Sequence, residues 1–124
     1  MTEADLQLAI CDYIRLKYPG AIFNSDGAGN NVSMAQAGRN TRLRSDRGYP
    51  DLFIAEPRGK YHGLYLELKR EGTRVWLRNG QLADDEQIRL QEHMLERLQQ
   101  RGYAGDFAIG YKEAVDKIDI YMGY

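Results

Sequence analysis

Two short apolar runs constrain this chain more than any other feature, because each carries charged residues in a fixed register. Asp51 opens the first run, and Glu67 and Lys69 stand at the end of the second. Alternate side chains of a β-strand share a face, so Glu67 and Lys69 point away from the neighbouring leucines. If a turn at residues 57–60 joins the runs as a hairpin, Asp51 reaches the same polar rim. The pattern therefore predicts a metal site beside a cation.

The length of the chain predicts a single domain, residues 1–124. With 43% hydrophobic residues the chain can bury roughly two thirds of its unfolded surface, and it is too short for two domains. Cys11 is the only cysteine, which excludes an internal disulfide and indicates a reducing compartment. The N-terminal residues are acidic where a targeting segment would be basic, and no apolar stretch is long enough to span a membrane. We expect a soluble protein of the cytoplasm.

Positive charge is concentrated in the middle of the sequence. Residues 39–78 hold ten basic and five acidic residues, a net charge of +5, whereas the remainder holds seven basic and thirteen acidic residues, a net charge of −6. A basic region suits nucleic acid, which is bound mainly through its phosphates, although solvated surface arginines are the alternative. The predicted DNA contacts are Arg39, Arg42, Arg44 and Arg47. They lie in residues 25–47, which we expect to be mobile in the free protein and ordered on DNA.

The order of the predicted elements indicates an α/β sandwich. A helix begins at Thr2, where Asp5 completes an acidic variant of the capping box, and ends at Tyr18-Pro19-Gly20. The pattern then predicts a strand at 21–23, a loop at 24–48, the two strands of the hairpin, a tight turn at 79–80, a helix from Asp84 or Asp85 to about Arg101, a strand at 103–109 and a helix at 112–122. Helices that flank a small mixed sheet give this fold class.

Two polar residues lie on otherwise apolar helical stripes. Gln91 falls within the stripe of Ile88 and Leu95, where a buried polar group needs a partner. That partner could be backbone at the end of the sheet, a metal-bound water or a substrate phosphate. Glu3 extends the stripe of the first helix, seven residues before Ile10. Glu3 either complements the helix dipole or contributes an additional acidic group to the site.

Three ordered motifs resemble one protein family. They are Gly48-Tyr49-Pro50-Asp51-Leu52, then Leu66-Glu67-Leu68-Lys69, then Gln91 with Leu95, Leu98, Gly102 and Tyr103. A lone Glu-x-Lys triplet is weak evidence, but the ordered set is much stronger. The set resembles the VRR-NUC branch of the PD-(D/E)XK nuclease superfamily, over most of the chain. It is similar in particular to the small stand-alone members found in phages.

The resemblance implies a restriction-endonuclease-like core and an endonuclease that hydrolyses DNA phosphodiester bonds with Mg²⁺ or Mn²⁺. It implies metal binding by Asp51, Glu67 and the backbone carbonyl of Leu68, which agrees with the preference of Mg²⁺ for oxygen ligands. Lys69 would orient the attacking water or neutralise charge on the phosphate, and Gln91 would hold that water or Lys69 in place. The alternative for Glu67 and Lys69 is a surface ion pair on an edge strand.

The expected substrate is DNA recognised by its structure, since nothing resembles a major-groove recognition helix. One metal site cuts one strand at a time, so a symmetric homodimer would suit a Holliday-junction resolvase. The candidate interface residues are Trp76, Leu77, Tyr121 and Tyr124. The alternatives are a monomeric nickase or flap nuclease and a non-cleaving nucleic-acid-binding module of a larger complex. A phage-encoded protein would act in the host cytoplasm.

Overall fold

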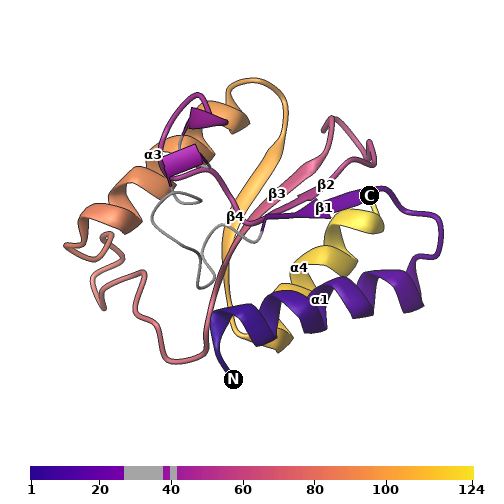
Figure 1. Cartoon of the computed structure of the whole chain (residues 1–124), viewed down its shortest axis with the longest axis horizontal. Helices are drawn as coiled ribbons and strands as arrows, with labels where there is room; N and C mark the ends of the chain where they lie inside the picture. Colours follow the sequence, from indigo (N-terminus) through magenta and orange to yellow (C-terminus); the bar gives the residue numbers. More distant parts are fainter. Residues whose placement is uncertain (27–37, 40–41) are drawn as a thin grey trace.

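The computed structural model describes residues 1–26, 38–39 and 42–124. The elements follow one another as α1 (Glu3–Lys17), β1 (Phe23–Ser25), β2 (Leu52–Ile54), β3 (Leu64–Lys69), α3 (Glu86–Gln99), β4 (Ala104–Ile109) and α4 (Tyr111–Met122) (Figure 1). Within the described part of the chain, no helix is long and apolar enough to cross a membrane. The predicted mobility of residues 25–47 concerns positions of which most lie outside the described residues.

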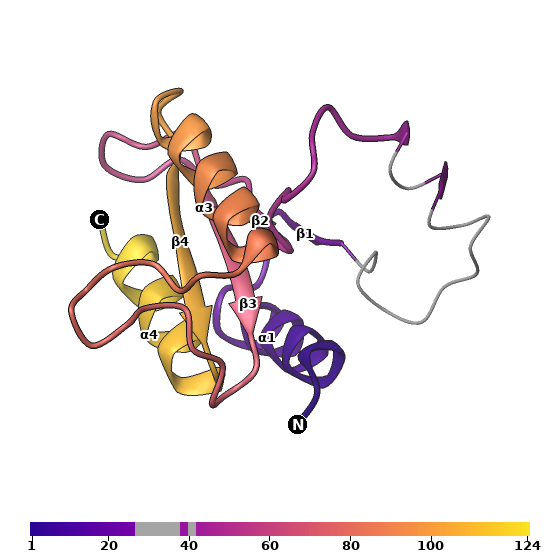
Figure 2. The same cartoon turned by 90° about the vertical axis from the view of Figure 1, so that its left-hand side faces the viewer.

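The four strands form one mixed sheet in the order β1-β2-β3-β4. β1, β2 and β3 pair antiparallel, whereas β4 runs parallel to β3. A parallel neighbour requires a crossover connection, and α3 supplies it. Figure 2 shows α3 on one face of the sheet and α1 and α4 on the other. The expected α/β sandwich is confirmed, and β3 lies in its interior.

Local signals explain where several elements begin and end. The hydroxyl of Thr2 accepts the N–H of Asp5 at 3.1 Å, and the Asp5 carboxylate accepts the N–H of Thr2 at 3.0 Å, so the predicted capping box is confirmed. Arg58 and Tyr61 exchange backbone hydrogen bonds across the predicted hairpin turn. α3 begins after Asp85, whose carboxylate accepts the N–H of Ile88. The predicted capping box, hairpin turn and helix cap are therefore all present in the folded chain.

Several predicted boundaries differ from the structure by one or two residues. β1 is Phe23–Ser25 instead of residues 21–23, because the pairing of Phe23 with Ile54 extends toward Ser25 and leaves Ile22 exposed. α3 ends at Gln99, two residues before the predicted end, and α4 begins one residue early, at Tyr111. Tertiary pairing and capping determine these ends, which hydrophobic periodicity does not report.

Each face of the sheet has its own core. On the α1 and α4 face the core is wholly apolar, with Ile10, Ile118 and the leucines of β3 at its centre. On the α3 face, Tyr65 and Phe107 pack against Leu95. Because Tyr65 alternates with Glu67 and Lys69 along β3, the face predicted as a polar rim is a second apolar core with polar groups at one end.

Candidate functional site

The hairpin brings the predicted polar residues together. Leu52 pairs with Leu66, so the antiparallel register sets Asp51 opposite Glu67. Asp51 immediately precedes β2, and its Oδ2 accepts the backbone N–H of Leu68 at 3.0 Å. Lys69 follows on the same face of β3, with its Nζ 3.9 Å from Oε1 of Glu67. A carboxylate from the start of one strand thus meets a carboxylate and an amine near the end of the next.

α3 covers this end of the sheet and brings Gln91 to it. The side-chain amide of Gln91 donates to Oε1 of Glu67 at 3.0 Å. The partner of this amide N–H is therefore the acid itself. The chain before Asp51 passes very close to the helix, since a Cβ at Gly48 would lie 2.7 Å from the carbonyl oxygen of Leu90. Gly48 also has a φ of +82°, so a glycine is required here on two counts.

The functional side chains are buried, which corrects the predicted rim. Glu67 is 3% exposed, Lys69 5% and Gln91 5%. β3 is an interior strand, so the alternative of a surface ion pair on an edge strand is wrong. Buried charges are costly unless they are paired or bind a cation.

Burial and mutual repulsion both disfavour charge on the two acids. Burial raises the pKa of Asp51, and the hydrogen bond from the Leu68 amide opposes that rise only in part. The pKa of Glu67 is raised well above its usual value, first by burial and then by the nearby charge of Asp51. A bound cation would reverse this effect, because it favours the ionised form of both acids.

An orphaned oxygen supports a cation at this point. Oε2 of Glu67 and Oε1 of Gln91 are buried without a hydrogen-bond partner among the described residues. Buried polar groups are almost always satisfied, so each such atom requires an explanation. A hard divalent cation takes carboxylate and carbonyl oxygens, which are the atoms left over here. The donor set therefore fits Mg²⁺ or Mn²⁺.

The backbone of Leu68 provides a third oxygen. Neighbouring residues of a strand direct their N–H and C=O groups to opposite sides. The carbonyl of Lys69 accepts the N–H of Gly110 on the β4 side, whereas the N–H of Leu68 is directed to Asp51. The Leu68 carbonyl therefore faces the side of Asp51. This oxygen matters because no three His, Cys, Asp or Glu side chains gather into a metal site within residues 1–26, 38–39 and 42–124.

The fold was compared with known proteins. No protein-family model and no curated protein matches the sequence. A solved structure described as a VRR_NUC domain protein matches over 99% of this chain and 89% of that chain, with a TM-score of 0.70 and 26% sequence identity. The chain has a VRR-NUC fold. The resemblance to the VRR-NUC branch is thereby confirmed, and it indicates a nuclease-type domain.

In this VRR-NUC fold, Glu3 lies at the mouth of the site. It is exposed at the start of α1, and it lines a cavity of about 440 Å³ together with Asp51, Glu67 and Gln91. Its charge contributes to the raised pKa values of both buried acids. This position is compatible with an additional acidic group in the site. It is also compatible with a favourable interaction with the helix dipole, since Glu3 lies in the first turn of α1.

The predicted DNA-contacting arginines differ in their surroundings. Arg44 forms an ion pair with Asp26 and is only partly exposed, whereas Arg47 is exposed, and both line the same cavity as the buried acids. Arg39 and Arg42 are exposed, and the residues between them lie outside the described part of the chain. The structure thus brings two of the four arginines to the carboxylate site.

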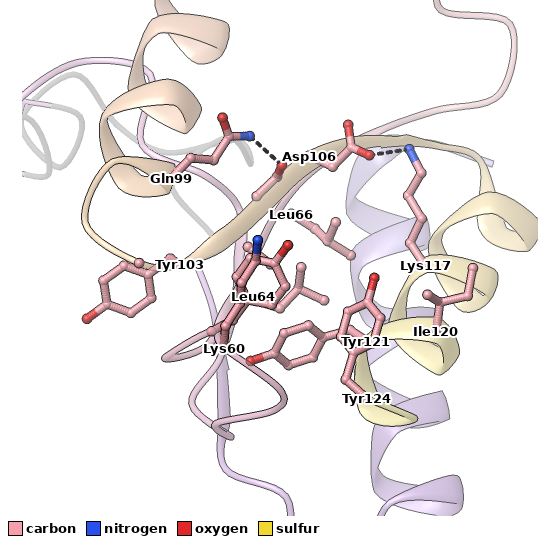
Figure 3. A pocket seen from close by; sticks show the side chains of 14 residues that line it. Lys60, Leu64, Leu66, Gln99, Tyr103, Asp106, Lys117, Ile120, Tyr121 and Tyr124 are labelled. Atoms are coloured by element: carbon pink, nitrogen blue, oxygen red, sulfur yellow. Dashed lines mark hydrogen bonds and ion pairs between the residues drawn. The ribbon is translucent and has the colours of Figure 1, made fainter.

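Another cavity of the VRR-NUC fold lies at the other end of the sheet. It has a volume of about 730 Å³ and is lined by residues that include Leu64, Tyr121 and Lys117 (Figure 3). Lys117 is paired with Asp106 there, so this cavity lacks the unsatisfied acid found beside Asp51. Among the candidate interface residues, Tyr121 is buried in the core, Leu77 is partly exposed, and Trp76 and Tyr124 are exposed.

Sequence reasoning missed two residues that contact the site. Gln7 and Ser25 form hydrogen bonds that lead to the backbone of Asp51. A signal for Gln7 was present, since it follows Glu3 by four residues and therefore lies on the same face of α1. No local pattern marks Ser25, because its role depends on pairing between segments that are distant in the sequence.

Proposed function

We propose that this VRR-NUC domain is a metal-dependent endonuclease that hydrolyses phosphodiester bonds in DNA. The observation that carries the proposal is the buried Glu67, which lies opposite Asp51 and has one oxygen without a hydrogen-bond partner in the part of the chain that the structure describes. Asp51, Glu67 and the Leu68 carbonyl would hold Mg²⁺ or Mn²⁺. When bound, the cation would polarise the phosphate and lower the pKa of the attacking water.

The residues of the chain then have distinct roles. Lys69, near the two acids, would orient the attacking water or neutralise charge that develops on the phosphate. Gln91 acts as a positioning residue, because its amide holds Oε1 of Glu67 and leaves Oε2 for the cation. Arg47 and Glu3 lie at the cavity mouth, where the basic side chain would contact a substrate phosphate.

The direct test is cleavage of flap, four-way junction and linear DNA by the purified protein with Mg²⁺ or Mn²⁺. Glu67→Gln should abolish cleavage and weaken Mn²⁺ binding measured by calorimetry. Glu92→Gln is the matched control, because Glu92 is a partly buried glutamate on the same helix as Gln91 but does not line the cavity. A wild-type protein that binds these DNAs but cuts none of them with either metal would favour the non-cleaving module.

We further propose a symmetric homodimer that cuts branched DNA, with four-way junctions as the preferred substrate. The described residues of each chain offer one such acid pair, the buried Glu67 and the partly buried Asp51, and symmetric cleavage of two strands needs two copies. Trp76 and Tyr124 are 45% and 62% exposed, which leaves both available for contact. Light scattering with and without a junction tests this. A strict monomer in both conditions would favour the nickase or flap-nuclease alternative.

A further inference from the structure

A chain of hydrogen bonds runs from α1 to Asp51. The side-chain amide of Gln7 donates to Oγ of Ser25 at 2.7 Å and also to the backbone carbonyl of Asp26. An amide group has two N–H donors, and these two contacts use both. Gln7 is partly buried on the face of α1 that carries Glu3, so it connects this helix to the end of β1.

The next contacts in the chain hold the backbone of Asp51. Oγ of Ser25 donates to the Asp51 carbonyl at 3.0 Å, and the N–H of Asp26 donates to the same oxygen at 2.7 Å. The paired part of β1 and β2 ends with Ser25 opposite Leu52. Asp51 therefore lies just outside the strand pairing, and these two donors fix its carbonyl.

The position of that carbonyl determines where the carboxylate lies. With the backbone fixed on the β1 side, Oδ2 of Asp51 accepts the N–H of Leu68 on the β3 side. We propose that Gln7 is a positioning residue that, through Ser25 and Asp26, holds the Asp51 carboxylate against β3. This inference deepens the proposed function, because the carboxylate that it positions is a proposed metal ligand.

The chemistry of the side chain explains why a glutamine is suited to this place. Glutamate has the same length but only acceptor oxygens when ionised, so it cannot donate to the Asp26 carbonyl. Methionine matches the length and volume of glutamine and has no N–H donor. Gln7→Met therefore removes the hydrogen bonds with little change in packing.

The first test is amide hydrogen exchange of the metal-free protein, with the Leu68 N–H as the reporter. Gln7→Met should speed exchange at Leu68 roughly fivefold, the factor that corresponds to about one net hydrogen bond, relative to the Ile118 amide in the buried core. Gln99→Met is the matched control, because it breaks a 2.8 Å bond to the carbonyl of Gly105 on the far edge strand. An unchanged Leu68 exchange rate in Gln7→Met would overturn the proposal.

The second test measures Mn²⁺ affinity by calorimetry in the same variants. Gln7→Met should weaken Mn²⁺ binding roughly tenfold, as loss of a group that orients a ligand does, and Gln99→Met should not. In a Ser25→Ala background the effect of Gln7→Met should become smaller, because the branch through Ser25 is already broken and only the branch through Asp26 remains. Additive effects would contradict a connection through Ser25. If Leu68 exchange responds while the wild-type protein neither binds Mn²⁺ nor cuts DNA, the positioning role stands and the proposed function fails.

Discussion

Two lysines beside the β3–β4 strand pair, Lys117 and Lys69, differ in burial and in how their charges are compensated. Lys117 is 31% exposed and has three partners, Asp106 at 2.9 Å, Glu113 at 3.0 Å and the carbonyl of Phe107 at 2.6 Å. The side chain of Lys69 is 6% exposed, and among the described residues the carboxylate within salt-bridge range is that of Glu67, at 3.9 Å. The first lysine is fully engaged in closing the outer edge of β4, whereas the second stands in a cluster that still has an orphaned oxygen.

The difference indicates separate roles for two clusters, that of Lys117 with Asp106 and Glu113 and that of Lys69 with Glu67 and Asp51. A satisfied ionic network near the surface adds modestly to stability and prevents an edge strand from pairing with another chain. A buried cluster with an unsatisfied acid costs stability unless a ligand completes it. We therefore expect changes at Lys117 to affect folding alone, and changes around Lys69 to affect function first.

The largest expected effect is the loss of cleavage when the buried cluster is altered. Asp51→Asn, Glu67→Gln and Lys69→Ala should each lower the rate of DNA cleavage by about 10³-fold or more, since each removes a group that acts at the reacting phosphate. The two carboxylate changes should also weaken Mn²⁺ binding, whereas Lys69→Ala should retain it. Lys117→Ala is the control and should cut DNA at the wild-type rate. Equal activity losses at both lysines would end the distinction between the two clusters.

The second effect is on how the stability of the metal-free protein depends on pH, which should differ between the acids beside Lys69 and the lysine Lys117. Because the folded-state pKa values of Asp51 and Glu67 are raised, charging them opposes folding, and the free energy of unfolding should increase as pH falls from 8 through these pKa values. One unit of pKa shift corresponds to about 1.4 kcal/mol. Glu67→Gln should remove most of this increase in denaturant titrations between pH 8 and 5.

Lys117 should respond in another pH range. Burial lowers the pKa of its ammonium, but the hydrogen bonds to Asp106 and Glu113 outweigh that effect and raise it above its usual value. Its contribution to stability is therefore complete below about pH 10 and is lost only as pH rises further. Between pH 8 and 5, Lys117→Ala should leave the slope of stability against pH unchanged. A flattened slope in this variant would show that the two clusters are coupled.

A smaller effect is expected at the arginines that surround the buried cluster. Alanine in place of Arg39, Arg42, Arg44 and Arg47 should weaken DNA binding and reduce the salt slope of log K by about one per phosphate contact. Arg44→Ala should also lower thermal stability slightly, because it breaks the ion pair with Asp26, whereas Arg47→Ala should not. Fluorescence anisotropy across a salt series measures the DNA affinity and its salt slope, and thermal denaturation measures the stability. A salt slope that none of the four changes alters would place the DNA elsewhere.

The smallest expected effect concerns β4, where Gln99 and Lys117 donate hydrogen bonds to backbone carbonyls of the strand. Gln99→Ala removes one hydrogen bond to the Gly105 carbonyl and should lower the free energy of unfolding by about 0.5–1.5 kcal/mol, with no change in cleavage. Lys117→Ala should cost a similar amount. Chemical denaturation of both variants, compared with Glu67→Gln at pH 7, measures the contrast directly. A stability loss in Glu67→Gln larger than in these variants would mean that the buried acid stabilises the fold.

Features that depend on neighbours in the sequence could be predicted from it. The capping box at Thr2, the hairpin turn at 57–60 and the helical position of Gln91 were all predicted, because each follows from residues within a few positions of one another. The shared face of Asp51 and Glu67 was also accessible, since strand alternation specifies it once the two strands pair.

Only the tertiary structure decided how these groups are used. The sequence does not reveal that β4 lies beside β3, and this placement makes β3 an interior strand and buries Glu67 and Lys69. The bond from Gln91 to Glu67, like the path from Gln7 to Asp51, joins segments far apart in the chain. Such contacts depend on how whole elements pack, and a local sequence pattern does not report that packing. The sequence by itself therefore determined which polar groups are present, and packing decided that Glu67 and Lys69 are buried and that burial and a neighbouring acid raise the pKa of Glu67.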